Sequence, residues 1–215
     1  MTAVLPSAEP LTVAGPAGDL ETLLEVPHGA GRIAEYAVVC HPHPLHGGTM
    51  QNKVVHTLAR AFQELGLATL RFNFRGVGAS GGAYDHGRGE TDDALAVIEW
   101  GAHRWPGAAV SLAGFSFGAL VAMRAAPRVG ATRLVCVAPP VARPEAAALG
   151  PPGCPWLIIQ GDADELVDYR QVSAFAARSS PAPTLRVLAG VDHFFHGRLR
   201  ELQTTVLDFV RPPAP

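Results

Sequence analysis

The chain has 215 residues, of which 48% are hydrophobic and 17% charged, so it can form a packed core and is not a disordered chain. Its 17 basic and 19 acidic side chains give a net charge of -2, and no run of Lys or Arg could neutralise several phosphates, which argues against a nucleic-acid partner.

No stretch approaches the roughly 18 to 20 apolar residues of a membrane span, and residues 1–15 lack the features of a signal peptide. The three cysteines, with no C-x-x-C pair, are expected to be reduced and buried. The sequence thus predicts one domain, residues 1–215, in the cytoplasm and away from membranes.

The first predicted elements are two strands at residues 11–13 and 20–26, joined by a turn-rich hairpin. From residue 36 onward, short apolar strands alternate with segments whose apolar residues recur at helical spacing. Strands are expected at residues 36–40, 68–74, 109–114, 133–137, 156–160 and 184–188, and helices at 52–65, 91–102, 117–126, 169–178 and 198–210. This alternation predicts an α/β fold, with a mostly parallel central sheet, an N-terminal antiparallel hairpin and helices on both faces.

Ligands of such sheets bind at the carboxyl ends of the strands, and the loop after the strand at 109–114 carries a recognisable motif. Residues 114–118 read Gly-Phe-Ser-Phe-Gly, a G-x-S-x-G sequence that runs directly into an apolar helix. A turn this sharp strains its central residue and needs small neighbours, and it would project the Ser116 hydroxyl above the sheet. Ser116 is therefore the candidate nucleophile.

A serine nucleophile needs a base and an acid that orients the base, and two later loops offer both. The strand at 156–160 leads into Gly-Asp-Ala-Asp-Glu-Leu-Val, and the strand at 184–188 leads into Ala-Gly-Val-Asp-His-Phe-Phe. His193 is the candidate base, and either Asp162 or Asp164 is the candidate acid. The order Ser, Asp, His at three strand ends predicts a catalytic triad.

Acyl transfer also needs two backbone donors for the oxyanion. The N–H of Phe117, directly after the nucleophile, is one candidate. The other should lie in the loop after the strand at 36–40, where prolines 42 and 44 have no N–H to give. The residues alone leave His43 or Leu45 as the second donor.

On these residues the chain resembles the α/β-hydrolase superfamily over nearly its whole length. The matching segments are the elbow at 114–118, the acid loop at 161–167, the histidine loop at 191–195 and Cys-His-Pro-His-Pro-Leu-His-Gly-Gly at 40–48. The chain looks most like small bacterial members without a lid, related to dienelactone hydrolases, although those carry Cys where this chain has Ser116. The resemblance implies that Asp164 is the triad acid and that the N–H of His43 completes the oxyanion hole, while His41 braces its loop.

Two other interpretations start from the histidines and from the fold. His41, His43 and His46 resemble part of the metal motif of metallo-β-lactamase-like hydrolases, but Leu45 stands where that motif has Asp, and prolines 42 and 44 stiffen the segment. A metal-dependent hydrolase is therefore an alternative, and a non-catalytic interaction protein on a hydrolase fold is another. The main interpretation requires no cofactor and no metal.

Residues 76–81 match G-x-G-x-x-G, the dinucleotide-binding fingerprint. That motif needs a helix to begin within it, whereas residues 81–89 contain four glycines and no helical pattern. We expect a tight loop beside the active site, with Arg75 forming a structural ion pair.

The segment 138–155 follows the strand where hydrolases of this kind usually insert a lid. It has six prolines in eighteen residues, so it can hold one short helix around residues 145–149 but no cap domain. An open cleft gains little from long acyl chains. The sequence thus predicts a carboxylesterase-like serine hydrolase that cleaves small-molecule carboxylic esters of short acyl groups through an acyl-enzyme intermediate, and leaves the oligomeric state open.

Overall fold

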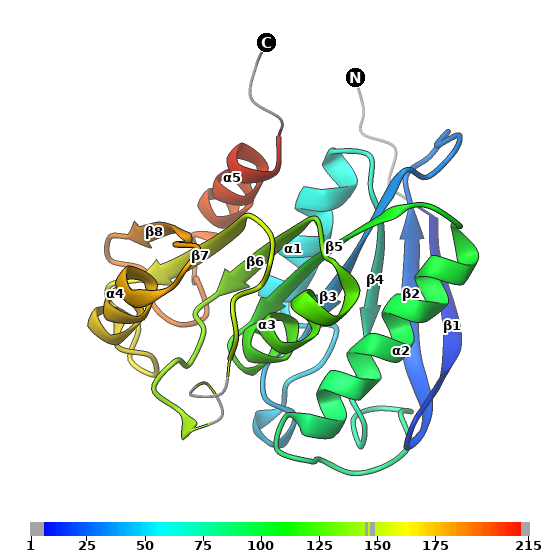
Figure 1. The fold of residues 1–215 in the computed structure, drawn as a ribbon, viewed down its shortest axis with the longest axis horizontal. Helices are drawn as coiled ribbons and strands as arrows, with labels where there is room; N and C mark the ends of the chain where they lie inside the picture. The colour runs from blue at the N-terminus through cyan, green and yellow to red at the C-terminus, as the bar shows by residue number, and fades with distance from the viewer. Residues whose placement is uncertain (1–6, 145, 147–148, 212–215) are drawn as a thin grey trace.

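The computed structural model describes residues 7–144, 146 and 149–211, and one eight-stranded sheet forms its centre (Figure 1). The strands are β1 Ser7–Gly15, β2 Gly18–Val26, β3 Glu35–Cys40, β4 Ala68–Phe72, β5 Ala109–Phe115, β6 Arg133–Val137, β7 Trp156–Gly161 and β8 Thr184–Leu188. Their spatial order is β1-β2-β4-β3-β5-β6-β7-β8. β1 pairs with β2 and β2 with β4 in antiparallel register, and every later pair is parallel. The predicted sheet and N-terminal hairpin are confirmed.

In the described residues, five α-helices and the 3-10 helix η1 lie between these strands or after the last of them. They are η1 Pro44–His46, α1 Lys53–Glu64, α2 Arg88–Arg104, α3 Phe117–Val129, α4 Tyr169–Arg178 and α5 Leu199–Val210. Helices α1 and α5 cover one face of the sheet, and α2, α3 and α4 cover the other (Figure 1). Helices on both faces bury the central strands, which explains why these strands read as continuous apolar runs.

The sheet separates two hydrophobic cores, and β3 shows how its residues divide between them. Tyr36, Val38 and Cys40 belong to the core under α2, α3 and α4, whereas Ala37 and Val39 belong to the core under α1 and α5. Successive side chains of a strand point to opposite faces, so one short apolar run serves both cores. The carboxyl ends of β3 and β5 to β8 consequently open at one edge of a rigid sheet.

Element boundaries differ from the predicted ones where side chains cap the helices. Helix α1 begins at Lys53 because the Asn52 carboxamide oxygen accepts a 2.9 Å hydrogen bond from the Val54 N–H. Helix α2 begins at Arg88, three residues earlier than predicted, because the buried Glu90 carboxylate accepts hydrogen bonds from backbone N–H groups just ahead of the helix. The glycine-rich sequence ahead of α2 concealed the start of this helix.

The connection between β6 and β7 contains no α-helix among its described residues. The short helix predicted around residues 145–149 includes positions 145, 147 and 148, which lie outside the described residues. Of the other two residues, Ala146 has 3-10 conformation, and its carbonyl accepts a 3.2 Å hydrogen bond from the Leu149 N–H. Across the described chain, no helix combines the length and the hydropathy that crossing a membrane requires.

Candidate active site

Ser116 occupies the sharp turn between β5 and α3. Its backbone has φ 53° and ψ -121°, a conformation that L side chains rarely adopt, and its N–H donates a 2.8 Å hydrogen bond to the carbonyl of Val137 in β6. A Cβ on Gly114 would collide with the carbonyl of Gly118, and a Cβ on Gly118 with the carbonyls at the end of β3. The two glycines of the motif are thus required by close backbone contact, and the strained turn presents the serine at the edge of the sheet.

The acid and histidine loops meet beside this turn. His193 Nδ1 lies 2.8 Å from Asp164 Oδ2, and the two side chains are 4% and 0% exposed. The His193 ring also packs on Phe115 of β5, with ring centroids 5.0 Å apart. Of the two predicted acids, Asp164 is the one that contacts the histidine.

Asp164 is held as an ionised acceptor. Burial raises the pKa of this carboxyl, but hydrogen bonds from His193 and from the Val167 and Leu166 N–H groups outweigh that effect, and the net pKa is lowered. Oδ1 accepts from the N–H groups of Val167 and Leu166 at 2.7 and 2.9 Å. Oδ2 accepts from Gln160 Nε2 at 2.9 Å as well as from His193.

Asp162 has a different role in the same loop. Its Oδ1 accepts a 2.6 Å hydrogen bond from the N–H of Gly190, which ties the acid loop to the segment that leads to His193. No hydrogen bond links Asp162 to the histidine ring in the described chain. Asp162 is a loop anchor, and its loss should not remove the orienting charge.

Ser116 and His193 line one cavity of about 470 Å³. The loops after β3, β5, β6, β7 and β8 all contribute to it, with His43, Phe117, Arg143, Leu166 and Phe194 among the lining residues. In the described part of the chain no hydrogen bond joins Ser116 Oγ to His193. Catalytic hydrogen bonds are often long without substrate and shorten in the reacting complex, so this arrangement is compatible with proton transfer between the two.

The two predicted oxyanion donors also border this cavity. Phe117 is the first residue of α3, where helical N–H groups have no intrahelical acceptor. His43 precedes η1; its Nδ1 accepts from the Leu45 N–H at 3.2 Å, and its Nε2 lies 3.2 Å from the Tyr84 hydroxyl. The ring of His43 packs against that of Phe117 with centroids 4.9 Å apart. Contacts with Tyr84 and Phe117 thus hold the loop that carries the second predicted donor.

His41 is fully buried, and both of its ring nitrogens form hydrogen bonds with backbone groups. Its Nδ1–H donates to the Pro42 carbonyl at 2.6 Å, and its Nε2 accepts from the Phe74 N–H at 3.0 Å. Burial lowers its pKa to about 4, so the ring is neutral. Because both nitrogens are engaged, His41 is a poor ligand for a metal, and the described residues contain no group of His, Cys, Asp or Glu that could hold one.

The G-x-G-x-x-G segment, expected as a tight loop beside the active site, packs against the β1–β2 hairpin, and none of its residues lines the Ser116 cavity. The N–H of Gly81 donates to the Asp19 carbonyl at 2.8 Å, and Gly18 and Gly81 approach so closely that a Cβ on either would lie 3.1 Å from the other's Cα. The motif therefore fits a loop against the end of the β1–β2 hairpin. Its glycines allow a close backbone contact that the linear sequence does not reveal.

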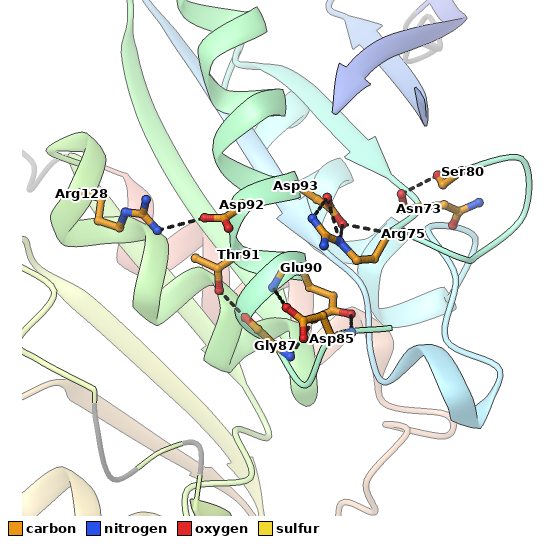
Figure 2. Close-up of polar contacts among 11 residues, drawn as sticks. Asn73, Arg75, Ser80, Asp85, Gly87, Glu90, Thr91, Asp92, Asp93 and Arg128 are labelled. Carbon is orange, nitrogen blue, oxygen red and sulfur yellow. Dashed lines mark hydrogen bonds and ion pairs between the residues drawn. The ribbon is translucent and has the colours of Figure 1, made fainter. Parts of the chain in front are cut away.

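Arg75 forms the predicted ion pair, in a network that Figure 2 shows at the start of α2. Its guanidinium contacts both oxygens of the buried Asp93, with the shortest distance, 2.7 Å, between Nη2 and Oδ1. Nearby, Glu90 accepts from the N–H groups of Asp85 and Gly87 at 2.8 and 2.7 Å. The network fixes the segment that carries Tyr84.

Gln160, the last polar residue of β7, was not anticipated from the sequence. It is fully buried, and its Nε2 donates to Asp164 Oδ2, while its Oε1 has no hydrogen-bond partner in the described chain. The only signal was a polar residue at the end of an apolar run. An unsatisfied buried oxygen costs stability, and it is retained here beside the Asp164–His193 pair.

A strained serine after the fifth strand and a buried Asp–His pair on the next loops define an α/β-hydrolase, the fold that the sequence resemblance implied. The chain belongs to the family described as serine aminopeptidase, S33, whose model matches residues 43–153. That range includes Ser116 and ends before the acid and histidine loops.

Relatives of known structure are similar over almost the whole chain. An alpha-beta serine hydrolase homologue from Coxiella burnetii is 47% identical, with a TM-score of 0.91, over 97% of this chain and 99% of that one. A serine hydrolase without lid from Xanthomonas campestris is 42% identical, with a TM-score of 0.91, over 97% of both chains. An uncharacterised protein of Rickettsia prowazekii is 36% identical over 82% of this chain and 79% of its own. The chain is therefore a member of a group of α/β serine hydrolases that includes a lidless one.

Proposed function

We propose that this serine hydrolase cleaves carboxylic esters of small acyl groups, with Ser116 as nucleophile, His193 as base and Asp164 as the orienting acid. The observation that carries the proposal is the buried Asp164–His193 hydrogen bond, with His193 lining the same cavity as the strained Ser116. An ionised carboxylate only accepts hydrogen bonds, so His193 carries its proton on Nδ1 and has the lone pair on Nε2.

The reaction follows from these roles. His193 Nε2 takes the proton of Ser116 as Oγ attacks the ester carbonyl, and the N–H groups of Phe117 and His43 stabilise the oxyanion. The intermediate collapses as His193 returns the proton to the leaving alcohol, which leaves an acyl-Ser116 ester. Water then attacks this ester with His193 again as base, and the acid is released.

The small-acyl preference is supported by the modest cavity and by the connection between β6 and β7, which has no α-helix in its described residues. A cleft without a cap cannot enclose a long chain, so added methylenes gain little. The resemblance to dienelactone hydrolases stays part of the proposal at the level of ancestry only, because Ser116 replaces their cysteine. The three unpaired, buried cysteines support a reducing location such as the cytoplasm.

The test compares the wild-type protein with Ser116→Ala on p-nitrophenyl esters from acetate to palmitate. Ser173→Ala, which changes a serine of α4 outside the cavity, is the matched control. We expect hydrolysis of short esters to disappear in Ser116→Ala, to persist in the control and to be unaffected by EDTA. Loss of activity with EDTA together with its retention in Ser116→Ala would instead favour the metal-dependent alternative.

The family description makes amide bonds a second substrate class that the same triad could attack. Aminoacyl p-nitroanilides should therefore be assayed beside the esters. We expect kcat/KM for the short ester to exceed that for the anilide by orders of magnitude, and the opposite ranking would make the protein an aminopeptidase.

A further inference from the structure

A second cavity lies next to the one at Ser116, across a narrow partition. This α1 cavity, of about 370 Å³, is bordered by the start of α1 and by the chain from Phe194 to Leu199. Two residues, Asn52 and Phe194, line both the α1 cavity and the Ser116 cavity. They form the partition between the two spaces.

Of these two residues, Phe194 is the one whose side chain can be removed without disturbing a helix. Asn52 caps α1 through its hydrogen bond to the Val54 N–H. The Phe194 ring is 42% exposed and stands edge-on to the rings of His193 and Phe115, with centroids 5.1 and 6.3 Å away. An exposed aromatic ring held at the catalytic histidine is therefore the main barrier between the cavities.

The α1 cavity suits an apolar group. Its lining includes the partly buried Leu199 and the almost fully buried Val54 and Phe195, together with the exposed Gln51, Lys53 and His196. The His196 ring is engaged with Asp192 through a 2.7 Å contact at Nδ1. An alkyl or aryl group could lie on the apolar side chains without displacing a buried charge.

The position of Phe194 also identifies which part of an ester it would meet. In the proposed reaction His193 returns its proton to the leaving oxygen, so the alcohol group must lie on the His193 side of the cavity. Phe194 packs against that same ring. The partition thus faces the alcohol rather than the acyl group.

We propose that Phe194 limits the size of the ester alcohol, and that the α1 cavity is a subsite for the distal part of a longer alkyl alcohol that the Phe194 ring separates from Ser116. This inference rests on the proposed esterase function. Truncation of the ring would join the two cavities and let the alcohol extend toward the partly buried Leu199.

The experiment measures acid release from butyrate esters of alcohols from ethyl to octyl, for the wild-type protein and Phe194→Ala. The quantity compared is the ratio of kcat/KM for octyl over ethyl, because kcat/KM reports acylation, the step in which the alcohol leaves. We expect Phe194→Ala to raise this ratio on the order of tenfold, since filling an apolar pocket discriminates by about that factor. Phe194→Trp should lower the ratio.

Val187→Ala is the matched control, since Val187 is an apolar residue of β8 with the same 42% exposure as Phe194 and lines neither cavity. It should leave the alcohol ratio unchanged. A parallel series with a fixed ethyl group and acyl chains from acetyl to octanoyl should not show the Phe194→Ala shift. A displaced His193 would lower every rate equally and leave the ratios untouched.

The proposal for Phe194 fails if the wild-type protein is an active esterase and Phe194→Ala leaves the octyl-to-ethyl ratio unchanged. It also fails if Phe194→Ala shifts the ratio for the acyl series instead. A wild-type protein that hydrolyses none of these esters would defeat the proposed function itself.

Discussion

Two buried carboxylates of this molecule, Asp93 in α2 and Asp164 after β7, differ in the kind of partner that each one holds. Both side chains are 0% exposed, and each is paired at 2.7 to 2.8 Å. Asp93 holds a guanidinium that occupies both its oxygens, and its hydrogen bond is the main reason why the pKa of Arg75 is raised (Figure 2). Asp164 holds an imidazole that lines a cavity beside a strained serine.

The difference shows what separates a structural pair from a candidate catalytic one. Arg75 never loses its proton near neutral pH, so its pair with Asp93 can only connect the loop after β4 to α2. His193 can exchange a proton, and one of its edges borders open space. Burial and pairing alone do not mark function; an exchangeable proton with access to substrate does.

The largest expected effect comes from removing the charge of Asp164. Asp164→Asn should lower kcat for a short ester on the order of 10⁴-fold, because the imidazole loses its orienting carboxylate and the correct tautomer. Asp162→Asn, which disturbs only the hydrogen bond to Gly190, should cost less than about tenfold, or roughly 1.4 kcal/mol. Steady-state kinetics measures kcat for both variants, and circular dichroism checks that they fold. Similar losses of kcat in the two variants would remove Asp164 from the proposed triad.

On the structural side of the comparison, Asp93→Ala should lower the free energy of unfolding by about 3 to 5 kcal/mol, because it leaves Arg75 largely buried without a partner. Asp92→Ala, at the neighbouring residue, is the control. Asp92 pairs with Arg128 on the surface, where both side chains are more than half exposed, so this substitution should lower the free energy of unfolding by less than about 1 kcal/mol. Urea denaturation measures both. Equal losses would mean that the buried pair contributes no more than the exposed one.

The buried ring of His41 should make the free energy of unfolding depend on pH. Its pKa is lowered by burial from 6.5 to about 4, so the unfolded chain takes up this proton before the folded one does. The associated stability is fully present above pH 6.5 and is lost as the pH falls toward 4, by roughly 3 kcal/mol. Urea denaturation between pH 7 and 4.5 should show a steeper decline in the wild-type protein than in His41→Asn; parallel declines would contradict a neutral buried His41.

The smallest predicted effect is at Gln160. Gln160→Met removes the hydrogen bonds of Nε2 to Asp164 Oδ2 and to the carbonyls of Gly161 and Val167, together with the unsatisfied Oε1. We expect kcat to fall about tenfold, corresponding to a loss of roughly 1.4 kcal/mol, while the free energy of unfolding falls by no more than about 1 kcal/mol, because removal of the unsatisfied oxygen offsets the lost hydrogen bonds. A variant that is less stable but equally active would show that Gln160 only supports the fold.

Much of this organisation could be predicted from the sequence because it depends on local rules. Strand and helix periodicity predicted the order of the elements, and Gly-Phe-Ser-Phe-Gly between a strand and a helix predicted the turn at Ser116. The choice between Asp162 and Asp164 needed the resemblance, since both are polar residues of one loop. Only the structure shows that Asp162 bonds Gly190 and Asp164 contacts His193.

What the sequence missed depends on contacts between distant segments. The glycines at residues 76–81 match a nucleotide-binding motif but pack against the hairpin turn at Gly18. Gln160 and Phe194 gain their roles from the residues that fold next to them, and nothing in their flanking sequence signals this. Helix α2 begins early because Glu90 accepts from N–H groups ahead of it, which a Gly-rich sequence conceals.

The central claim is that Ser116 is a nucleophile activated by the Asp164–His193 pair. The most direct measurement is reaction with a fluorophosphonate probe, followed by mass spectrometry of the labelled peptides. We predict one adduct per chain, located on Ser116, with ester hydrolysis lost in proportion to labelling. Ester hydrolysis that continues in fully labelled protein, or an adduct on any other residue, would contradict the account.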